Sequence, residues 1–332
     1  MTPSLKRRLG GAGEKLWEHL PTHWREREPV LTLGSWIHQA VVRFGGRSQS
    51  LGTWFLRNEP LLLTLRDLVA DEFQAGERLR LCVVGCSTGA ELYSVLWILR
   101  RSRPDLKISA VGFDVSERSV EKAKTGYYAI ADPELRRGYF EVRGGAVLPD
   151  SLIAEIFDRE GSLLRVKRWI ADGVQWAVAD ARDANLVASI GERDVVLANN
   201  LIIHMNPRDA EACLESVIGL VKPGGILVCR GVDPDLREQA VRRFGLIPVR
   251  QRIEEIHNAD PSLDARRDWP WRYWGLEPFD KRRQDRFERY AAIFQTPLRD
   301  RDGLNPGERM PEKRATEGRC PVGASSPARG GT

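Results

Sequence analysis

Short apolar runs alternate with longer segments of helical periodicity over residues 51–256 of this chain. The short runs have the length of strands, and the longer segments place apolar residues on one side of a helix. Such alternation is typical of an α/β domain with a largely parallel sheet. Residues 221–225 (VKPGG) predict a turn into the last clear strand. The predicted central elements are strands Leu79–Val84, Lys107–Phe113, Asp194–Leu197 and Ile226–Cys229, and helix Ala90–Leu99.

The other segments of the chain differ from this pattern in composition and in the spacing of their apolar residues. Residues 1–50 carry aromatic and apolar positions at loosely helical spacing, which predicts one or two amphipathic helices. Residues 139–173 fit neither a single helix nor a crossover and predict a small inserted subdomain. Residues 257–296 are rich in tryptophan and arginine, and we interpret them as an extension anchored on the core. Residues 297–332 are poor in apolar side chains and predict a disordered tail.

Composition limits the class of protein further. Apolar residues make up 42% of the chain and charged residues 29%, which suits a soluble protein with a sizeable core. The net charge of +5 is small for a nucleic-acid-binding protein. Five scattered cysteines without a CxxC pair predict no metal site. Because no apolar stretch reaches about 18 residues and the first 20 residues lack a secretory apolar core, we expect a cytoplasmic protein without a membrane span.

The junction between the first strand and the first helix has the sequence GCSTG, which indicates a ligand site. Gly85 and Gly89 let the backbone approach a ligand, and the amides at the helix start favour a negative group. Asp114 ends the next strand, where nucleotide-binding α/β folds accept ribose hydroxyls, and Ser116 is the expected N-cap of the next helix. The pattern fits a dinucleotide enzyme, an S-adenosylmethionine enzyme, or two glycines that only form a tight turn. The missing G-x-G-x-x-G and G-x-x-x-x-G-K-[ST] spacings disfavour nicotinamide and exclude P-loop chemistry.

Several separated motifs together resemble the CheR family of chemotaxis-receptor methyltransferases. The run STGAELYS at residues 87–94 is similar to the family's STGEEPYS, and TWFLRN at residues 53–58 is similar to T-x-F-F-R-N. Residues 139–140 and 164–166 suggest the family's small β-subdomain. Further matches follow in order along the chain: FDV at 113–115, AKTGYY at 123–128, NLIIHM at 200–205 and LVKPGGILV at 220–228.

The resemblance implies a bacterial S-adenosylmethionine-dependent methyltransferase with a class I, Rossmann-like α/β fold. Such a fold has a seven-stranded sheet with helices on both faces, here with N-terminal helices and a small inserted β-subdomain. Asp180, where the family tends to have asparagine, would lie near the adenine, and Asn200 would touch the cofactor from the end of the fourth strand. The residues that the resemblance assigns to cofactor binding are Thr53, Arg57, Gly85, Ser87, Glu91, Asp114, Asp180 and Asn200.

Within this set, the resemblance gives four side chains particular roles. Thr53 and Arg57 would approach the methionine moiety, Glu91 would sit beside the sulfonium, and Asp114 would hold the ribose hydroxyls. The charges agree, because a carboxylate orients a sulfonium cation and a guanidinium can bind the carboxylate of the cofactor or of an acceptor in a bidentate manner. Arg57 is therefore also a catalytic candidate.

Three positions depart from the family's pattern. Ala90 replaces the first motif glutamate, Asn199 replaces an arginine, and His204 replaces the tyrosine beside the transfer site. A carboxylate acceptor needs positioning rather than a base, whereas histidine suits the deprotonation of a hydroxyl or an amine. His204 is therefore the second catalytic candidate, or else it satisfies only a local hydrogen bond.

The resemblance implies a protein glutamate side chain as the methyl acceptor. The short N-terminal segment, His204 and the C-terminal extension leave a small-molecule acceptor open. The same cofactor also serves intramolecular cyclisation and aminocarboxypropyl transfer, and a non-catalytic S-adenosylmethionine sensor is another alternative. Retention of Arg57, Glu91, Asp114 and Asn200 favours an enzyme over a sensor. The sequence indicates no oligomeric state.

Overall fold

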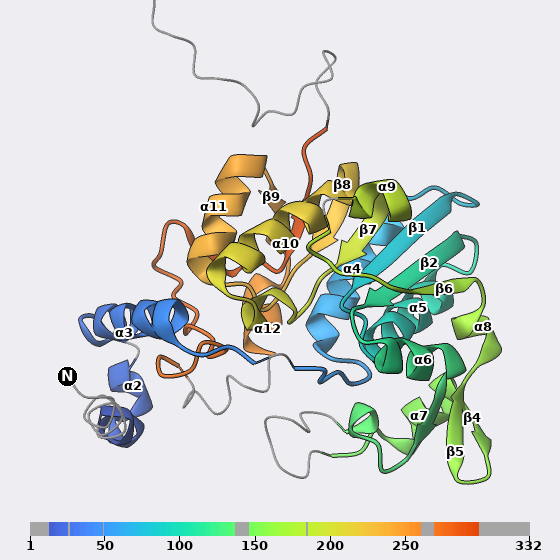
Figure 1. Cartoon of the computed structure of the whole chain (residues 1–332), viewed down its shortest axis with the longest axis horizontal. Helices are drawn as coiled ribbons and strands as arrows, with labels where there is room; N and C mark the ends of the chain where they lie inside the picture. The colour runs from blue at the N-terminus through green and yellow to red at the C-terminus, as the bar shows by residue number, and fades with distance from the viewer. Residues whose placement is uncertain are drawn as a thin grey trace, which may run out of the picture.

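The computed structural model describes residues 13–136, 146–259 and 269–298, apart from residues 26, 49 and 184. A seven-stranded sheet with the order β6-β2-β1-β7-β8-β10-β9 runs through its centre (Figure 1). The five neighbouring strands β6, β2, β1, β7 and β8 pair in parallel. Strand β10 runs antiparallel to both β8 and β9. The predicted Rossmann-like fold is confirmed. The strands are β1 (Arg78–Val84), β2 (Lys107–Asp114), β6 (Val174–Val178), β7 (Arg193–Leu197), β8 (Val221–Val228), β9 (Ile247–Pro248) and β10 (Ile293–Gln295).

The central strands were predicted from their apolar runs. The observed β1, β2 and β7 agree with the predicted limits to within one residue. The predicted start of β8 was wrong, because the VKPGG residues belong to the strand as an irregularity and not to a turn before it. The ladder pairs Arg193 with Val221 and then Val195 with Ile226, so the intervening residues bulge out of register.

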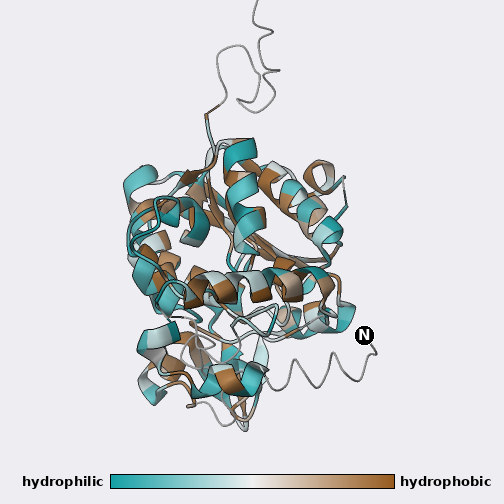
Figure 2. Ribbon diagram, turned by 90° about the vertical axis from the view of Figure 1, so that its left-hand side faces the viewer, coloured by the Kyte–Doolittle hydropathy of each residue, from teal (hydrophilic) through white to brown (hydrophobic). Residues whose placement is uncertain are grey.

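Successive residues of β1 face opposite layers of helices, because side chains alternate along a strand. Leu79, Leu81 and Val83 belong to one apolar core, and Cys82 and Val84 belong to the other. Figure 2 shows the apolar positions following the strands between the helices. The first core is covered by α4 (Glu59–Glu72), α5 (Ala90–Ser102) and α12 (Ile253–Asn258), and the second by α9 (Leu186–Ile190), α10 (Pro207–Gly219), α11 (Pro234–Phe244) and α14 (Arg286–Tyr290).

The two helices that follow β1 and β2 begin after residues that favour a helix N-terminus. Helix α5 starts after Gly89, whose φ of 90° favours glycine, and a Cβ there would lie 2.9 Å from the Trp176 ring. Helix α6 (Glu117–Thr125) starts after Ser116, whose Oγ accepts a hydrogen bond from the Ser119 N–H at 3.3 Å. The predicted N-cap is therefore confirmed.

A second, three-stranded sheet with the order β3-β5-β4 forms a small subdomain. Its strands are antiparallel, and α7 (Asp150–Ile156) and α8 (Arg168–Ala171) flank β4 and β5 in sequence. The first strand precedes the start predicted at residue 139, because a three-residue strand gives no readable periodicity. Residues 139–145 of the predicted insertion lie outside the described residues. The strands are β3 (Tyr127–Ala129), β4 (Phe157–Glu160) and β5 (Leu163–Val166).

This subdomain is tied to the glycine loop through Thr88. The Tyr128 hydroxyl donates to the Thr88 carbonyl at 2.5 Å, and the Thr88 hydroxyl donates to Glu134 at 2.8 Å. Glu134 lies in η1 (Pro133–Leu135) and also accepts from Lys122 of α6 at 2.8 Å. The insertion therefore braces the loop that follows β1.

The N-terminal helices and the C-terminal extension share a small core of their own. Residues 13–19 are helical, followed by α2 (Thr22–Arg25) and α3 (Val30–Phe44). Trp17 packs edge to face against Trp269, with ring centroids 5.5 Å apart. Gly34 makes room for this contact, since a Cβ there would lie 2.3 Å from the Trp269 ring. Within the described part of the chain, no helix combines the length and apolarity needed to cross a membrane.

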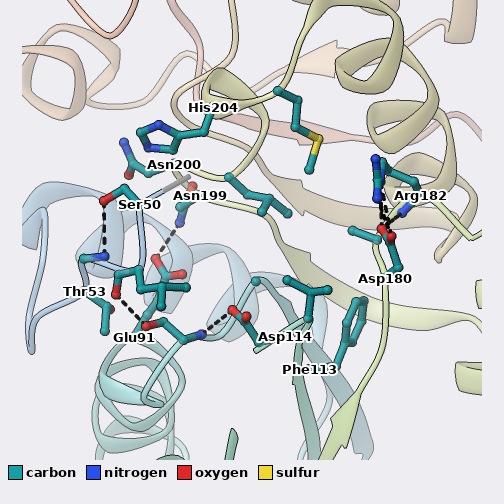
Figure 3. A pocket seen from close by; sticks show the side chains of 18 of the residues that line it. Ser50, Thr53, Glu91, Phe113, Asp114, Asp180, Arg182, Asn199, Asn200 and His204 are labelled. Atoms are coloured by element: carbon teal, nitrogen blue, oxygen red, sulfur yellow. Dashed lines mark hydrogen bonds and ion pairs between the residues drawn. The ribbon is translucent and has the colours of Figure 1, made fainter. Parts of the chain in front are cut away.

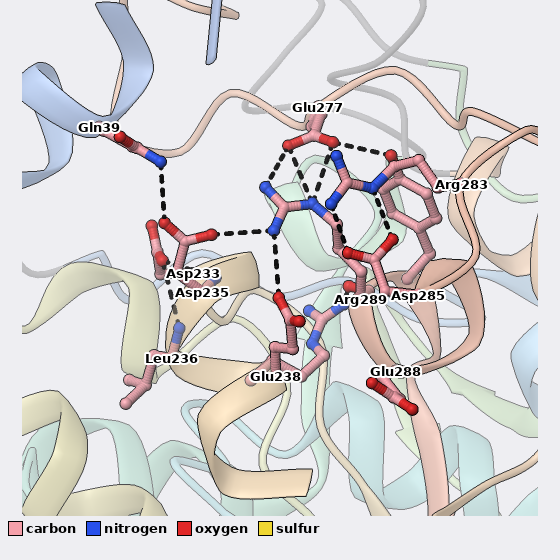
Figure 4. Close-up of polar contacts among 12 residues, drawn as sticks. Gln39, Asp233, Asp235, Leu236, Glu238, Glu277, Arg283, Asp285, Glu288 and Arg289 are labelled. Carbon is pink, nitrogen blue, oxygen red and sulfur yellow. Dashed lines mark hydrogen bonds and ion pairs between the residues drawn. The ribbon is translucent and has the colours of Figure 1, made fainter. Parts of the chain in front are cut away.

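The C-terminal extension also supplies a strand of the main sheet. β10 lies between β8 and β9, although the alternating α/β pattern of the sequence ends at residue 256 and β10 belongs to the predicted extension. Arg289, just before this strand, is buried and donates to Glu277 at 2.6 Å and to Asp235 at 2.8 Å (Figure 4). The Tyr290 hydroxyl also donates to Glu277, at 2.7 Å. The extension is thus an integral part of the domain, and residues 299–332 of the predicted tail lie outside the described residues.

Candidate active site

A cleft of about 370 Å³ opens at the carboxyl ends of β1, β2 and β7 (Figure 3). This edge is where open α/β sheets bind their ligands. Segments far apart in sequence meet there, from the residues before α4 to the loop after β7. The cleft brings together every residue that the sequence assigned to the cofactor or to catalysis: Thr53, Arg57, Gly85, Ser87, Glu91, Asp114, Asp180, Asn200 and His204.

Asp114 is fixed by the loop that follows β1. One of its carboxylate oxygens accepts from the Ser87 N–H and the other from the Ser116 N–H, both at 2.9 Å. Ser87 takes a positive φ of 48°, and Gly85 before it takes 67°, so the loop turns tightly over the end of the strand. Each carboxylate oxygen can accept more than one hydrogen bond. Asp114 can therefore also receive the hydroxyls of a ligand.

The segment before α4 lies against this loop. The Ser87 hydroxyl donates to the Leu51 carbonyl at 2.7 Å, and the Leu56 N–H donates to the Ser94 hydroxyl at 2.9 Å. The Arg57 guanidinium stacks on Trp54, 3.9 Å from the ring centroid, which orients it as a cation on the cleft wall. Thr53 lines the cleft between these contacts.

Glu91, in the first turn of α5, places a carboxylate inside the cleft. Asn199 donates to it at 2.7 Å and accepts from the Arg230 N–H at 2.9 Å, which fixes the amide orientation. Burial raises the pKa of Glu91, although the Asn199 hydrogen bond and the charges of Arg57 and Arg230 lower it. A cation bound beside Glu91 would favour the ionised carboxylate.

Asn200 adopts an unusual backbone conformation at the end of β7, with φ of 55°. The Asn200 backbone packs closely against Gly231. Only glycine fits there, since a Cβ at residue 231 would lie 2.8 Å from the Asn200 Cα. The side-chain oxygen of Asn200 is buried and has no hydrogen-bond partner among the described residues. Residues held in such conformations often serve a ligand, and an unpaired acceptor in a cleft is consistent with that.

Asp180 closes the end of the cleft beyond β6. Arg182 donates to it at 2.7 Å and also pairs with Asp209 at 3.1 Å. The Arg182 hydrogen bond lowers the pKa of Asp180, against a smaller opposing effect of burial. Asp180 is therefore ionised, and the Arg182 guanidinium partly neutralises its charge at this end of the cleft.

His204 lies in η2 (Ile202–His204), on the opposite side of the cleft from α5 (Figure 3). Its Nδ1 is 3.2 Å from the hydroxyl of Tyr273. Burial lowers the pKa of His204, the Ser48 carbonyl raises it, and the charges of Arg57 and Arg47 lower it, for a net decrease. His204 is thus neutral at pH 7 and can accept a proton.

Three participants were not assigned to the site from the sequence. Asn199 was noted only as a departure from a motif, yet it holds Glu91. Arg47 lines the cleft, and Tyr273 contacts His204 from the C-terminal extension. Neither carries a local signal, although the cluster of aromatic residues around Tyr273 indicated a packed surface.

The chemistry of these residues fits S-adenosylmethionine. Asp114 suits two ribose hydroxyls, Glu91 suits a sulfonium cation, and Arg57 suits a carboxylate. The unpaired oxygen of Asn200 suits a ligand N–H or O–H group. Within the described residues, no group of three or more histidines, cysteines or acids could hold a metal ion.

Comparisons with known proteins agree with this chemistry. Chemotaxis protein methyltransferase Cher2 of Pseudomonas putida is 28% identical, over 61% of this chain and 75% of its own length. Chemotaxis protein methyltransferase 2 of Vibrio cholerae is 26% identical, over 53% of this chain and 59% of its own length. The probable biofilm formation methyltransferase WspC of Pseudomonas aeruginosa is 26% identical, over 59% of this chain and 44% of its own length. The chain thus spans less than two thirds of two of these relatives.

The family model described as CheR methyltransferase, SAM binding domain, matches residues 52–250. The matched range covers β1 to β9 and all nine predicted site residues, and it ends before β10. Since the match extends over more than half of the sequence, this chain belongs to the CheR methyltransferase family and contains its S-adenosylmethionine-binding domain.

Proposed function

We propose that this protein transfers the methyl group of S-adenosylmethionine to an acceptor bound in the cleft. The observation that supports this most is the meeting of Asp114, Glu91 and Arg57 in one cleft at the carboxyl ends of the strands. The three charges match the ribose, sulfonium and carboxylate of one ligand. A dinucleotide would instead require a cradle for its pyrophosphate, and the GCSTG loop lacks that spacing.

The chain's own residues would bind and orient the two substrates. Asp114 and the loop at Ser87 hold the ribose, and Glu91, braced by Asn199, orients the sulfonium. Asp180 lies at the far end of the cleft, where we place the adenine. S-adenosylmethionine supplies an electrophilic methyl group on a positively charged sulfur. Its transfer needs an aligned nucleophile more than covalent help from the protein.

For the acceptor, we propose first a glutamate side chain of a protein. The family resemblance implies this acceptor, and two of the relatives carry the name of chemotaxis protein methyltransferases. A second class of acceptor, a small molecule, is favoured by one feature of the cleft. His204 and Arg47 form its wall beside Tyr273 of the C-terminal extension, so the family domain alone does not complete the site.

Two measurements test this proposal. Calorimetry should show that the purified protein binds S-adenosylmethionine, and no binding would exclude the proposal. Methyl-labelled S-adenosylmethionine is then incubated with the protein and a lysate of the source cells. Base-labile label in protein would support glutamate methylation, and label in metabolites would support the small-molecule acceptor.

The same incubation separates the remaining alternatives. A non-catalytic sensor would bind S-adenosylmethionine without producing S-adenosylhomocysteine. Cyclisation or aminocarboxypropyl transfer would consume the cofactor and leave the methyl label on the sulfur-containing product. Formation of S-adenosylhomocysteine together with a labelled acceptor is the outcome that the proposal requires.

A further inference from the structure

Arg47 is a half-buried cation on the cleft wall, and it lies outside the range that the family model matches. Its Nη1 donates to the Ile203 carbonyl at 2.5 Å, and its Nη2 donates to the Val42 carbonyl at 2.7 Å. The guanidinium also lies over the Tyr273 ring, 4.4 Å from the centroid. These three contacts hold the guanidinium in one place beside η2.

Tyr273 also fixes the main chain next to Arg47. Its hydroxyl lies 3.1 Å from the Ser48 carbonyl oxygen and 3.3 Å from the Ser48 nitrogen, and the residue is only 4% exposed. The same hydroxyl is 3.2 Å from His204 Nδ1, so Arg47 and His204 belong to one wall of the cleft. A side chain that is already held in place loses little conformational entropy when it binds a ligand.

The charge of Arg47 is not neutralised within the described part of the chain. A guanidinium has five N–H donors, and the two that are used here bond to main-chain carbonyls. No described carboxylate forms an ion pair with Arg47, and its buried Nε–H has no hydrogen-bond partner among the described residues. Burial lowers the pKa of Arg47 and the charge of Asp233 raises it, but a guanidinium stays protonated in proteins. A partly desolvated cation of this kind favours the binding of an anion.

The charged groups of S-adenosylmethionine leave Arg47 without a partner in the proposed function. Glu91 faces the sulfonium, and Arg57 binds the carboxylate of the methionine moiety. Arg57 also lowers the pKa of Glu91, which agrees with a position at the sulfonium end. The ammonium of the cofactor is a cation and would be repelled by Arg47. Arg47 therefore remains for an anion on the second substrate of the cleft.

We propose that Arg47 binds the carboxylate that accepts the methyl group. This inference rests on the proposed methyl transfer and names the chemical class of its acceptor. A glutamate side chain of a protein and a small carboxylic acid both carry such a group. Because the matched family range begins at residue 52, the segment before that range adds this part of the acceptor site.

The atoms and charges balance in this assignment without a base, because a carboxylate is ionised at pH 7. One of its oxygens forms a bond to the methyl carbon, and the bond between that carbon and sulfur breaks. The electron pair of the broken bond stays on sulfur. The negative charge of the carboxylate and the positive charge of the sulfonium both disappear, and the products are a methyl ester and S-adenosylhomocysteine. The neutral ester attracts Arg47 less than the carboxylate did, which favours its release.

Carboxylate binding at Arg47 can be measured before the acceptor is identified. Protein labelled with ¹⁵N-arginine and loaded with S-adenosylhomocysteine is titrated with glutarate, and Arg47→Lys identifies the Arg47 Nε–H signal. We expect glutarate to shift this signal in a saturable manner and the neutral glutaramide to leave it unchanged. No shift with glutarate, or an equal shift of the exposed Arg43, would overturn the assignment.

Arg47→Gln tests the same contact during methyl transfer. The variant lacks the charge but keeps an amide that can donate to one of the two carbonyls. With methyl-labelled S-adenosylmethionine and little lysate, we expect label transfer to fall about 10–100-fold and to recover in part as more lysate is added. Alkali-labile label supports the carboxylate, and its presence on protein or on metabolites tells which source carries it. Label that resists mild alkali, or full transfer by Arg47→Gln, would overturn the assignment.

Calorimetry separates the acceptor's carboxylate from that of the cofactor. In Arg47→Gln, affinity for S-adenosylmethionine should stay within about threefold of the unmodified protein. A loss of about tenfold or more would assign Arg47 to the cofactor and overturn the proposal. Arg43→Gln is the matched control, because Arg43 is an exposed arginine of α3 outside the cleft, and it should leave label transfer unchanged.

A purely structural role for Arg47 has a different signature. Arg47→Lys keeps the charge and should restore part of the transfer that Arg47→Gln loses. Equal loss in both variants, together with lower stability in urea, would overturn the proposal. Failure of the underlying methyl transfer is recognised separately, because the unmodified protein would then not bind S-adenosylmethionine in calorimetry. The glutarate titration of Arg47 can still be performed without the nucleoside.

Discussion

Replacement of Asp114 by asparagine separates its two tasks, holding the loop and binding the cofactor. The carboxylate accepts two backbone N–H groups, from Ser87 and Ser116, and is only 6% exposed. In Asp114→Asn the amide nitrogen cannot accept, so one of these donors loses its partner. An unpaired buried donor costs about 1–3 kcal/mol, and we expect that loss in the free energy of unfolding.

The loss in cofactor affinity should come on top of this cost. A ribose hydroxyl that bonds to a charged acceptor contributes about 1.5–3 kcal/mol, and asparagine offers a neutral oxygen and one fewer acceptor. At about 1.4 kcal/mol per tenfold change, we expect affinity for S-adenosylmethionine to fall about 10–100-fold. Urea denaturation measures the first effect, and titration calorimetry measures the second.

Asp158→Asn is a suitable control, because Asp158 is an exposed residue of β4 outside the cleft. It should alter neither quantity. If Asp114→Asn is destabilised but binds the cofactor as tightly as the unmodified protein, Asp114 only holds the loop. The ribose would then bind elsewhere, and the reasoning from the strand end would be refuted.

Three further predictions concern stability. Burial lowers the pKa of His257 to about 4, so the unfolded chain takes up a proton near pH 6.5 that the folded protein takes up only near pH 4. Stability should therefore fall by about 3 kcal/mol between pH 6.5 and pH 4, and His257→Gln should remove this part in urea titrations at both pH values. Gly89→Ala should cost about 1–3 kcal/mol in the same assay, because its φ is positive and its Cβ would meet Trp176; an unchanged midpoint would show that the turn adapts. Arg289→Met should cost about 3–5 kcal/mol by leaving Glu277 buried without its cation, and adding Glu277→Gln should restore part of the loss.

The sequence predicted the part of the fold that local patterns encode. β1, β2 and β7 each contain a short apolar run that is buried between two helix layers, so their composition identifies them. β9 and β10 contain two and three residues, which is too short for any periodicity. β10 forms by pairing with the edge of β8, and β9 forms by pairing with β10. Pairing between segments distant in sequence cannot be predicted from a short window of residues.

The site shows the same division. Gly85, Asp114 and Asn200 lie at or just after strand ends, so a correct strand assignment and the family motifs were enough to bring them together. Arg47 and Tyr273 reach the cleft only because the N-terminal and C-terminal segments pack beside it. Contacts between segments more than 200 residues apart depend on packing that no motif describes.

The position of β10 also has a consequence for synthesis. It is the last of the described strands to leave the ribosome, yet it lies inside the sheet between β8 and β9. At roughly 5–20 residues per second, β8 is complete several seconds before its partner exists. During that time its hydrogen-bonding edge is exposed, and such edges pair readily with other chains. A premature stop codon after the family domain but before residue 293 would make that exposure permanent, so the cell would accumulate an aggregating fragment in place of a smaller enzyme.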